Sequence, residues 1–236
     1  MALRYDTVLL DADETLFDFK RSEREAVAEA FRSIGVEADE EMLRVYSEIN
    51  GSMWKLLERG EIEKKVLFYH RFEVFFERYG ISADPHEMAD RYMLRLAEKG
   101  YLLDGARALC LRLREVARLY IVTNGTEFIQ RGRYAKSGLS DCFEDTFISD
   151  VIGAEKPSVT FFERVAEQIP DFRRERTLIV GDSLTSDMQG GVNFGIDTCW
   201  YNPQGKEVSP NLSGKITYIA GSLEEIYDWI VRGDKV

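Results

Sequence analysis

The sequence predicts an α/β protein with a Rossmann-like, doubly wound parallel sheet as its core and an α-helical cap inserted after the first strand. Three observations predict this class. Short, continuous apolar runs rich in β-branched residues recur along the chain, as expected of strands buried on both faces. Helical segments separate most of the later runs, which is the order typical of parallel sheets. Residues 19–100 show no convincing strand, only apolar residues at helical spacing.

The first strand is expected at residues 7–10, where four apolar or β-branched residues precede a polar stretch. Further strands of the same pattern are expected at residues 119–123, 146–148, 177–180, 198–201 and 216–220. Helices are expected at residues 160–168 and 223–230. The last helix opens with a capping box, since Ser222 is followed three residues later by Glu225.

Four apolar stripes at helical spacing predict helices in the insert, and two glycines, Gly35 and Gly80, stand where helices are expected to end. The stripes consist of Val27, Ala30, Phe31 and Ile34; Met42, Val45, Tyr46 and Ile49; Phe68, Phe72, Phe75, Phe76 and Tyr79; and Met88, Tyr92 and Leu96. The predicted domains are therefore a core of residues 1–18 and 101–236 and a helical cap of residues 19–100. Ligands of open parallel sheets bind beyond the carboxyl ends of the strands, so a cap inserted there is expected to act as a lid.

Composition and charge exclude several kinds of protein. The chain has 236 residues, of which 44% are hydrophobic, and its net charge of −11 opposes binding to nucleic-acid polymers or anionic membranes. Its three cysteines are far apart and form no CxxC pair, which argues against a disulfide framework or a thiolate zinc site. No apolar run approaches the length of a membrane span and the start of the sequence lacks a signal-peptide pattern, so a cytoplasmic protein is expected.

Polar and acidic residues follow the predicted strands at four places, all expected at one edge of the sheet. They are Asp11, Asp13 and Thr15; Thr123 and Asn124; Lys156, after the apolar run that ends at Ile152; and Asp182 and Asp187. Carboxylates brought this close repel one another unless a positive charge offsets them. Mg²⁺ is the cation that the pattern favours, because it binds a few carboxylates together with water and phosphate oxygens. With only two histidines, a histidine-rich zinc or iron site is not expected.

The pair Asp11 and Asp13 suggests covalent catalysis. Two aspartates at positions i and i+2 of an extended segment point to the same side, so one can attack while the other moves a proton. We assign nucleophilic attack to Asp11, through an aspartyl-phosphate intermediate, and general acid/base work to Asp13. Phosphoryl oxygens would be held by the metal, the Lys156 ammonium, the Thr123 hydroxyl and nearby backbone N–H groups, with Asn124 among the phosphate-binding residues.

These residues resemble the four motifs of the haloacid dehalogenase superfamily, and the likeness covers essentially the whole chain. The matching stretches are Asp11-Ala12-Asp13-Glu14-Thr15, Thr123, Lys156-Pro157, and Gly181-Asp182 with Asp187. The insert looks like the helical C1 cap of that superfamily. The resemblance implies that Asp11 binds the metal as well as attacking, that Asp13 is a ligand through its backbone carbonyl, that Asp182 is a direct ligand, and that Asp187 orients metal-bound water.

Within that superfamily the chain is most similar to bacterial house-cleaning pyrimidine 5′-nucleotidases. The likeness rests on residues 11–17, 122–125 and 197–203, which lie mostly in the predicted core. It implies a phosphatase that acts on a nucleoside 5′-monophosphate. Candidate substrate contacts are Phe17, Asn50 and Trp54, where a base or sugar could stack or form hydrogen bonds. Gln130, Arg133 and Lys136 are interpreted as a solvated helix face.

Other functions remain open at this point. The substrate could be another small phosphorylated metabolite, such as a sugar phosphate. A dehalogenase would need neither Asp13 nor a metal, and a phosphomutase would need a cap that excludes water. A receiver-type phosphoacceptor also places aspartates, a threonine and a lysine around Mg²⁺, but it is shorter and has no helical insert. An inactive scaffold of the same fold would not need the complete set of charged groups. The sequence does not indicate an oligomeric state.

Overall fold

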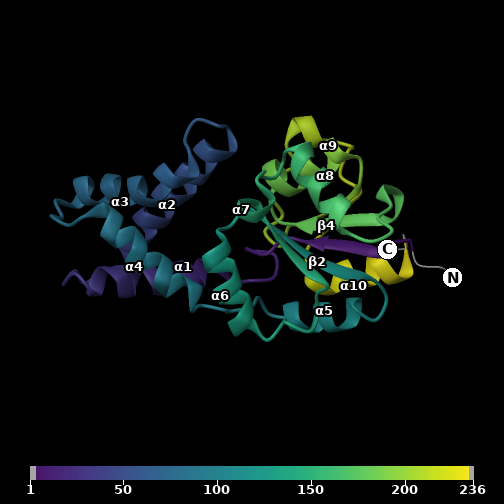
Figure 1. Ribbon diagram of the computed structural model, residues 1–236, viewed down its shortest axis with the longest axis horizontal. Helices are drawn as coiled ribbons and strands as arrows, with labels where there is room; N and C mark the ends of the chain where they lie inside the picture. Colours follow the sequence, from purple (N-terminus) through teal and green to yellow (C-terminus); the bar gives the residue numbers. More distant parts are fainter. Residues whose placement is uncertain (1–3, 234–236) are drawn as a thin grey trace. The chain divides into compact units, whose positions relative to one another are not determined.

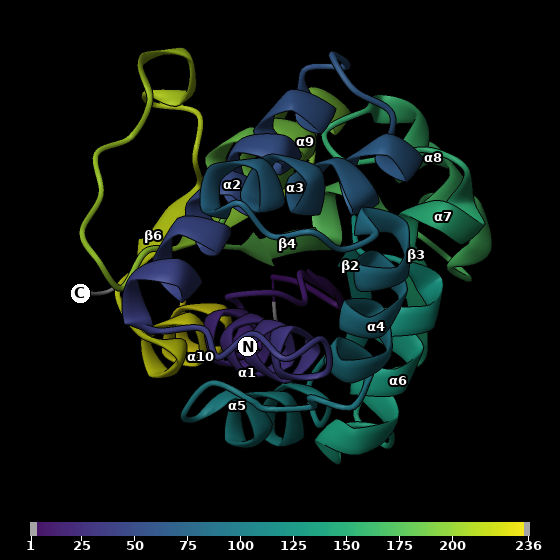
Figure 2. The ribbon, with the colours of Figure 1, turned by 90° about the vertical axis from the view of Figure 1, so that its left-hand side faces the viewer.

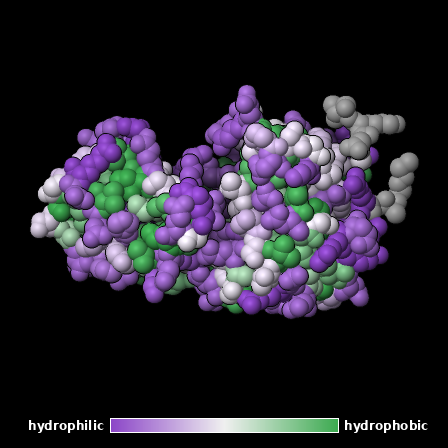
Figure 3. All heavy atoms as spheres, turned by 90° about the horizontal axis from the view of Figure 1, so that it is seen from above, coloured by the Kyte–Doolittle hydropathy of each residue, from purple (hydrophilic) through white to green (hydrophobic). Residues whose placement is uncertain are grey.

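The computed structural model describes residues 4–233, and the chain divides into two compact units (Figure 1). The first, which we call the core unit, joins the residues up to Asp18 with those from Tyr101 onward. The second, which we call the cap unit, is Phe19–Gly100. Hydrophilic side chains cover most of the face displayed in Figure 3, with smaller apolar patches between them. In the described part of the chain, no helix is both long and apolar enough to cross a membrane.

The core unit is built on one six-stranded sheet with the strand order β3-β2-β1-β4-β5-β6, in which every neighbouring pair is parallel. Its strands are β1 (Thr7–Leu10), β2 (Arg118–Thr123), β3 (Asp145–Ile148), β4 (Thr177–Gly181), β5 (Asp197–Tyr201) and β6 (Tyr218–Ala220). The predicted α/β fold with a parallel sheet is therefore confirmed. Each strand begins or ends within two residues of its predicted position, because a buried parallel strand is marked by an uninterrupted apolar run.

Helices cover both faces of this sheet (Figure 2). The core-unit helices are α5 (Ala106–Leu113), α6 (Glu127–Ser137), α7 (Ser149–Ile152), α8 (Val159–Gln168), α9 (Gln189–Phe194) and α10 (Leu223–Arg232). One apolar cluster joins the sheet to α5 and α10, and a second joins it to α7, α8 and α9. Alternate residues of β1 serve the two clusters, with Val8 and Leu10 in the first and Leu9 in the second. The predicted cap of α10 is present, since Ser222 Oγ accepts from the Glu225 N–H at 3.2 Å.

The cap unit contains four helices, α1 (Phe19–Arg32), α2 (Glu40–Glu58), α3 (Lys64–Tyr79) and α4 (Pro85–Ala97). Asp39 and Asp84 cap the second and fourth, each accepting a backbone N–H at 2.8 Å. Gly80 ends α3 at φ +64°, a left-handed conformation that glycine adopts without strain. The stripes read from the sequence form an aromatic core, in which the rings of Phe31 and Phe75 stack at 4.8 Å between centroids.

Candidate active site

The carboxyl ends of β1, β2 and β4 meet where the chain order of the sheet reverses. After β3 the chain returns to the other side of β1, so β1 lies between β2 and β4. Leu10, the last residue of β1, is in register with Ile121 and Val180. Such a switch point leaves a crevice between loops that diverge in opposite directions, which is where open α/β sheets bind ligands. The loops after these three strands carry most of the residues predicted from the sequence, and Lys156 comes from the loop after α7.

Asp11 leaves β1 directly into this crevice and is held on both carboxylate oxygens. Its Oδ1 accepts from Lys156 Nζ at 2.6 Å, and its Oδ2 accepts from the Thr15 hydroxyl at 3.3 Å. Lys156 is 2% exposed and donates a further hydrogen bond to the Val122 carbonyl at 2.9 Å. The third acceptor of this ammonium is the Asp187 carboxylate. An ammonium fixed by three acceptors holds the Asp11 carboxylate in one orientation.

Lys156 reaches this position by a different route from the one predicted. The sequence predicts a strand at residues 146–148 and places Lys156 after an apolar run that ends at Ile152. β3 does end at Ile148, and the rest of that run is the short helix α7. Periodicity cannot separate four residues of strand from one turn of helix, so the extra length is a helical turn. The lysine therefore arrives from a loop after α7 and not directly from a strand end.

Three carboxylates form a compact group around the ammonium. One oxygen each from Asp11, Asp182 and Asp187 lies within 4.8 Å of the others. Asp187, on the π-helical turn Leu184–Met188, accepts from Lys156 Nζ at 2.6 Å and from the Ser183 N–H at 3.1 Å. A Cβ at Gly181 would lie 2.2 Å from Asp187 Oδ2, so only glycine at the end of β4 lets this carboxylate approach.

Burial and mutual repulsion shift the protonation of this group. Burial, and then the charge of Asp187, raise the pKa of Asp182 to about 7. The same two causes raise the pKa of Asp11 well above its usual range, against the opposing effect of Lys156. Burial lowers the pKa of Lys156, but the Asp11 and Asp187 carboxylates outweigh burial and raise it above its ordinary value. The site thus holds more negative charge than one ammonium offsets.

That excess fits a hard divalent cation. The three side chains offer only oxygen ligands, which Mg²⁺ prefers. Among the described residues, they form the one group of three or more acidic, histidine or cysteine side chains close enough to hold a metal ion. Asp13 does not belong to this group of side chains. The ligand role that the family resemblance implies for its backbone carbonyl stays a prediction.

Two side chains fix the backbone of the site residues. The Asn124 amide donates to the Lys156 carbonyl and accepts from the Lys156 N–H, both at 2.8 Å. On the other side, the buried indole of Trp200 donates to the Asp182 carbonyl at 2.8 Å. The Asn124 side chain is thus occupied by Lys156, and its predicted contact with phosphate stays a prediction. Trp200 lies in the stretch 197–203 that carries the family likeness, but the sequence predicts no role for its side chain, because nothing local to β5 indicates a partner on another loop.

Thr123, the last residue of β2, presents its hydroxyl oxygen as an acceptor. It accepts from the Gly125 N–H at 3.1 Å and from Gln130 Nε2 at 3.3 Å. A hydroxyl that already accepts two hydrogen bonds keeps its own proton for a third partner. The threonine is 2% exposed, so that donor is oriented and not free to rotate in water. This arrangement suits the phosphate contact predicted for it.

Asp13 contacts two residues for which the sequence interpretation was wrong. Gln130 and Arg133 were interpreted as a solvated face of α6, but they are 4% and 0% exposed. Gln130 Nε2 donates to Asp13 Oδ2 at 2.8 Å, and Arg133 Nη1 forms an ion pair with Asp13 Oδ1. Only Lys136, the third residue of that interpretation, is exposed. A charged residue on an amphipathic helix is usually solvated, and its carboxylate partner here is remote in sequence.

The three substrate candidates lie in different surroundings. Phe17 is 1% exposed, and its ring lies under the Arg133 guanidinium at 4.8 Å from the centroid. Trp54 lies on α2 and is partly buried. Asn50, also on α2, is 2% exposed and links two buried charged residues of the cap unit, donating to Glu23 at 2.6 Å and accepting from Arg71 at 2.9 Å. Substrate contacts by all three stay predictions.

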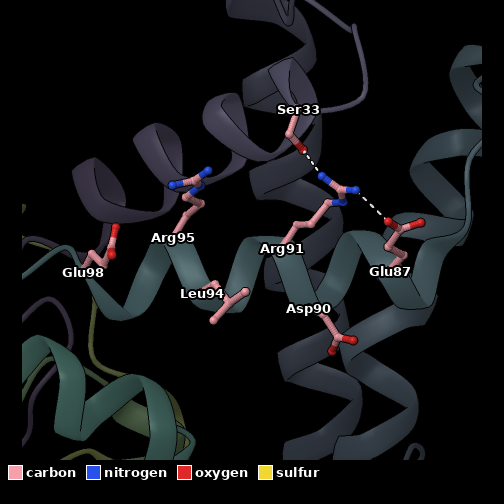
Figure 4. A pocket seen from close by; sticks show the side chains of 7 residues that line it. All are labelled: Ser33, Glu87, Asp90, Arg91, Leu94, Arg95 and Glu98. Atoms are coloured by element: carbon pink, nitrogen blue, oxygen red, sulfur yellow. Dashed lines mark hydrogen bonds and ion pairs between the residues drawn. The ribbon is translucent and has the colours of Figure 1, made fainter.

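A separate pocket of about 530 Å³ lies on the cap unit, between α1 and α4 (Figure 4). It is lined by Ser33, Glu87, Asp90, Arg91, Leu94, Arg95 and Glu98. Its Arg91 is shared between Glu87 at 2.6 Å and Ser33 at 3.1 Å, so its charge is largely offset within the pocket. This pocket contains none of the predicted site residues.

Comparison with known proteins gives consistent results. A family model described as "haloacid dehalogenase-like hydrolase" matches residues 5–195. The chain is 39% identical over 225 residues to the pyrimidine 5′-nucleotidase PynA of Streptococcus pneumoniae, covering 95% of this chain and 94% of that protein. It is 32% identical over 224 residues to the pyrimidine 5′-nucleotidase YjjG of Escherichia coli, covering 95% and 97% respectively.

A solved structure gives the same picture. The putative HAD-hydrolase YfnB of Bacillus subtilis is 39% identical over 225 residues, covering 95% of this chain and 94% of that protein. Its magnesium-bound crystal structure, described as revealing interdomain movement, superimposes with a TM-score of 0.91 and covers 96% of this chain and 99% of that one.

Proposed function

The chain belongs to the haloacid dehalogenase-like hydrolases, and from this premise we propose that it is a Mg²⁺-dependent phosphatase of small phosphomonoesters, acting through an aspartyl-phosphate on Asp11. One observation carries the proposal. The Asp11 carboxylate, at the switch point of the sheet, is held by a buried ammonium 2.6 Å away and stands within 4.8 Å of two further carboxylates. This arrangement supports the proposed roles, a fixed nucleophile beside a place for a cation and a phosphate.

Asp11 and Asp182, together with the backbone carbonyl of Asp13, would hold the cation directly, and Asp187, whose carboxylate lies beside theirs, would orient metal-bound water. When bound, Mg²⁺ supplies positive charge that polarises the phosphoryl group and lowers repulsion between the substrate and the carboxylates. Lys156 supplies the remaining positive charge from a fixed position, and the Thr123 hydroxyl donates to a phosphoryl oxygen. These contacts orient phosphorus towards the Asp11 carboxylate, and positioning of this kind is most of what catalyses phosphoryl transfer.

The reaction then proceeds in two steps. An Asp11 oxygen forms a bond to phosphorus while the ester P–O bond breaks, and the Asp13 carboxyl gives its proton to the departing oxygen. In the second step a water oxygen forms a bond to phosphorus, its proton passes to the Asp13 carboxylate, and the bond between phosphorus and the Asp11 oxygen breaks. Inorganic phosphate leaves and both carboxyl groups return to their initial states.

For the substrate, we propose a pyrimidine nucleoside 5′-monophosphate. Support comes from PynA and YjjG, both named pyrimidine 5′-nucleotidases and both similar along almost the whole chain. The cap unit, Phe19–Gly100, is the part that we propose selects the substrate, while the core unit performs the chemistry. Asn50 and Trp54 of the cap unit are proposed contacts for the base or sugar.

A substrate screen tests this proposal. Purified protein is assayed for phosphate release with UMP, dUMP, dTMP, purine nucleotides and sugar phosphates, with Mg²⁺ and with a chelator. We expect hydrolysis that requires Mg²⁺, with the highest kcat/KM on pyrimidine nucleotides. Asp11→Asn, purified in parallel, reveals any contaminating phosphatase. If sugar phosphates exceed every nucleotide by an order of magnitude in kcat/KM, the proposed substrate class is wrong while the phosphatase chemistry stands.

A further inference from the structure

We propose that Gln130 and Arg133 are positioning residues that hold Asp13 for proton transfer to and from the substrate. The inference rests on the proposed function, because it assigns their role through the acid/base work of Asp13. Neither residue belongs to the group of side chains that would hold the cation. Both come from α6, whereas Asp13 comes from the loop after β1.

The two residues bind different oxygens of one carboxyl group. Gln130 Nε2 donates to Oδ2 at 2.8 Å and Arg133 Nη1 pairs with Oδ1. Two donors from one rigid helix fix both the rotamer of the Asp13 side chain and the orientation of its carboxyl plane. A carboxyl group has about four lone-pair positions, so two remain for the proton that it exchanges with substrate. Asp13 is the exposed partner, with 29% of its side chain accessible against 0% for Arg133.

The surroundings of both residues are shaped for this contact. A Cβ at Gly125 would lie 2.3 Å from Gln130 Nε2, so a larger residue there would push the amide away from Asp13. The Arg133 guanidinium lies over the ring of Phe17, 4.8 Å from its centroid. Burying an arginine is costly unless it is paired with an opposite charge. Arg133 is fully buried and its partner Asp13 is partly exposed, so the accessible part of the pair is the Asp13 carboxylate. Gly125 thus leaves room for Gln130 and Phe17 supports Arg133, and both of these α6 side chains bind the Asp13 carboxylate.

Gln130 also joins Asp13 to the phosphate side of the site. Its Nε2 lies 3.3 Å from Thr123 Oγ1. One amide group therefore contacts both Asp13, the proposed proton carrier, and Thr123, whose hydroxyl is proposed to donate a hydrogen bond to phosphate. The leaving oxygen and the phosphoryl oxygens belong to one phosphate group, so their spacing is set by the substrate. The side chains that contact them, Asp13 and Thr123, must therefore keep a constant distance from each other, and the Gln130 amide links the two.

This role predicts a dependence on the leaving group. A departing oxygen that is weakly acidic needs a proton from Asp13, whereas a strongly acidic phenol leaves without one. The parameter kcat/KM reports on this first step, because the phosphorylated enzyme forms when the leaving group departs. Misplacing Asp13 must therefore lower kcat/KM most for the least acidic leaving groups, while a loss of folded enzyme lowers kcat/KM by one factor for every substrate.

The experiment measures kcat/KM with Mg²⁺ for a series of substituted phenyl phosphates that differ in the acidity of the phenol. The unaltered protein should show a shallow dependence and Asp13→Asn a steep one. For Gln130→Met and Arg133→Lys we expect an intermediate slope, with a loss about tenfold larger for the least acidic phenol than for the most acidic one, as a fraction of the 10²–10⁴ that acid/base catalysis contributes. Either variant suffices if the other fails to fold.

Arg131→Met is the matched control on the same helix. Arg131 is 63% exposed and pairs with Glu127 at 2.7 Å, away from Asp13, so the control should keep the slope of the unaltered protein. The inference is overturned if Gln130→Met and Arg133→Lys keep that slope as well, whatever their overall activity. If the unaltered protein hydrolyses no phosphate ester, the proposed function fails and takes the inference with it.

Discussion

Magnesium affinity should fall as the pH is lowered through 7, because the cation and a proton compete for Asp182. The pKa of that carboxyl is raised to about 7 by burial and by Asp187, so below pH 7 a growing share of the molecules should carry a proton there. Each further pH unit costs about a factor of ten, or about 1.4 kcal/mol of binding free energy. The raised pKa of Asp11 adds to this slope.

Isothermal titration calorimetry of Mg²⁺ into chelator-treated protein, between pH 8 and pH 5.5, measures the effect. We expect the dissociation constant to be at least about tenfold higher at pH 6 than at pH 8. Asp182→Asn should bind weakly at every pH and with a smaller slope. Asp145→Asn removes an exposed carboxylate at the start of β3 and serves as the control. Equal affinity at pH 8 and pH 6 would refute the reasoning.

The same carboxyl affects stability in the opposite direction. Its pKa is higher in the folded than in the unfolded state, so folding is favoured below the unfolded value of 3.8 and this contribution is lost as the pH rises towards 7. The loss for Asp182 amounts to at most about 4 kcal/mol. Urea denaturation without Mg²⁺ should therefore show falling stability over this window, and Mg²⁺ should restore it at pH 8.

Three substitutions probe other parts of the structure. Gly181→Ala should weaken Mg²⁺ binding about tenfold by calorimetry, since its Cβ would lie 2.2 Å from Asp187 Oδ2 and displace that carboxylate. Lys156→Met leaves two buried carboxylates without their ammonium and should destabilise the protein by about 3–5 kcal/mol in urea denaturation at pH 8, with a smaller loss at pH 5. Asn50→Ala removes the amide that accepts from a buried arginine and donates to buried Glu23, and should cost about 3 kcal/mol by the same measurement.

Much of the fold could be predicted because its signals are local. The strand of residues 7–10 is an unbroken apolar run followed by polar residues, and such runs occur where both faces of a strand are covered. The carboxyl ends of parallel strands share one edge, so Asp11, Thr123 and Asp182 could be expected near one another without a three-dimensional model. The turn of α7 could not, because four residues satisfy either periodicity.

The contacts of Gln130 and Arg133 with Asp13 could not be predicted from the sequence, for a physical reason. Arg133 lies on a helix among charged neighbours, where the ordinary interpretation is a solvated side chain. Its burial depends on Asp13, which is 120 residues away in the chain, and on the ring of Phe17. Only a pairing between distant segments makes such burial favourable, and no local pattern reports it. The contact of Trp200, whose indole donates to the Asp182 carbonyl from another strand, could not be predicted for the same reason.

The covalent step on Asp11 is the central claim, and trapping the intermediate tests it most directly. The Asp13→Asn variant is mixed with Mg²⁺ and a phenyl phosphate whose phenol is strongly acidic. This substrate can phosphorylate Asp11 without a proton donor, but the variant lacks the carboxylate that would activate water in the second step. We expect intact-mass spectrometry to show one added phosphoryl group per chain, and peptide mapping to place it on Asp11. Phenol release without a phosphorylated Asp11, or turnover by Asp11→Asn at the rate of the unaltered protein, would contradict the account.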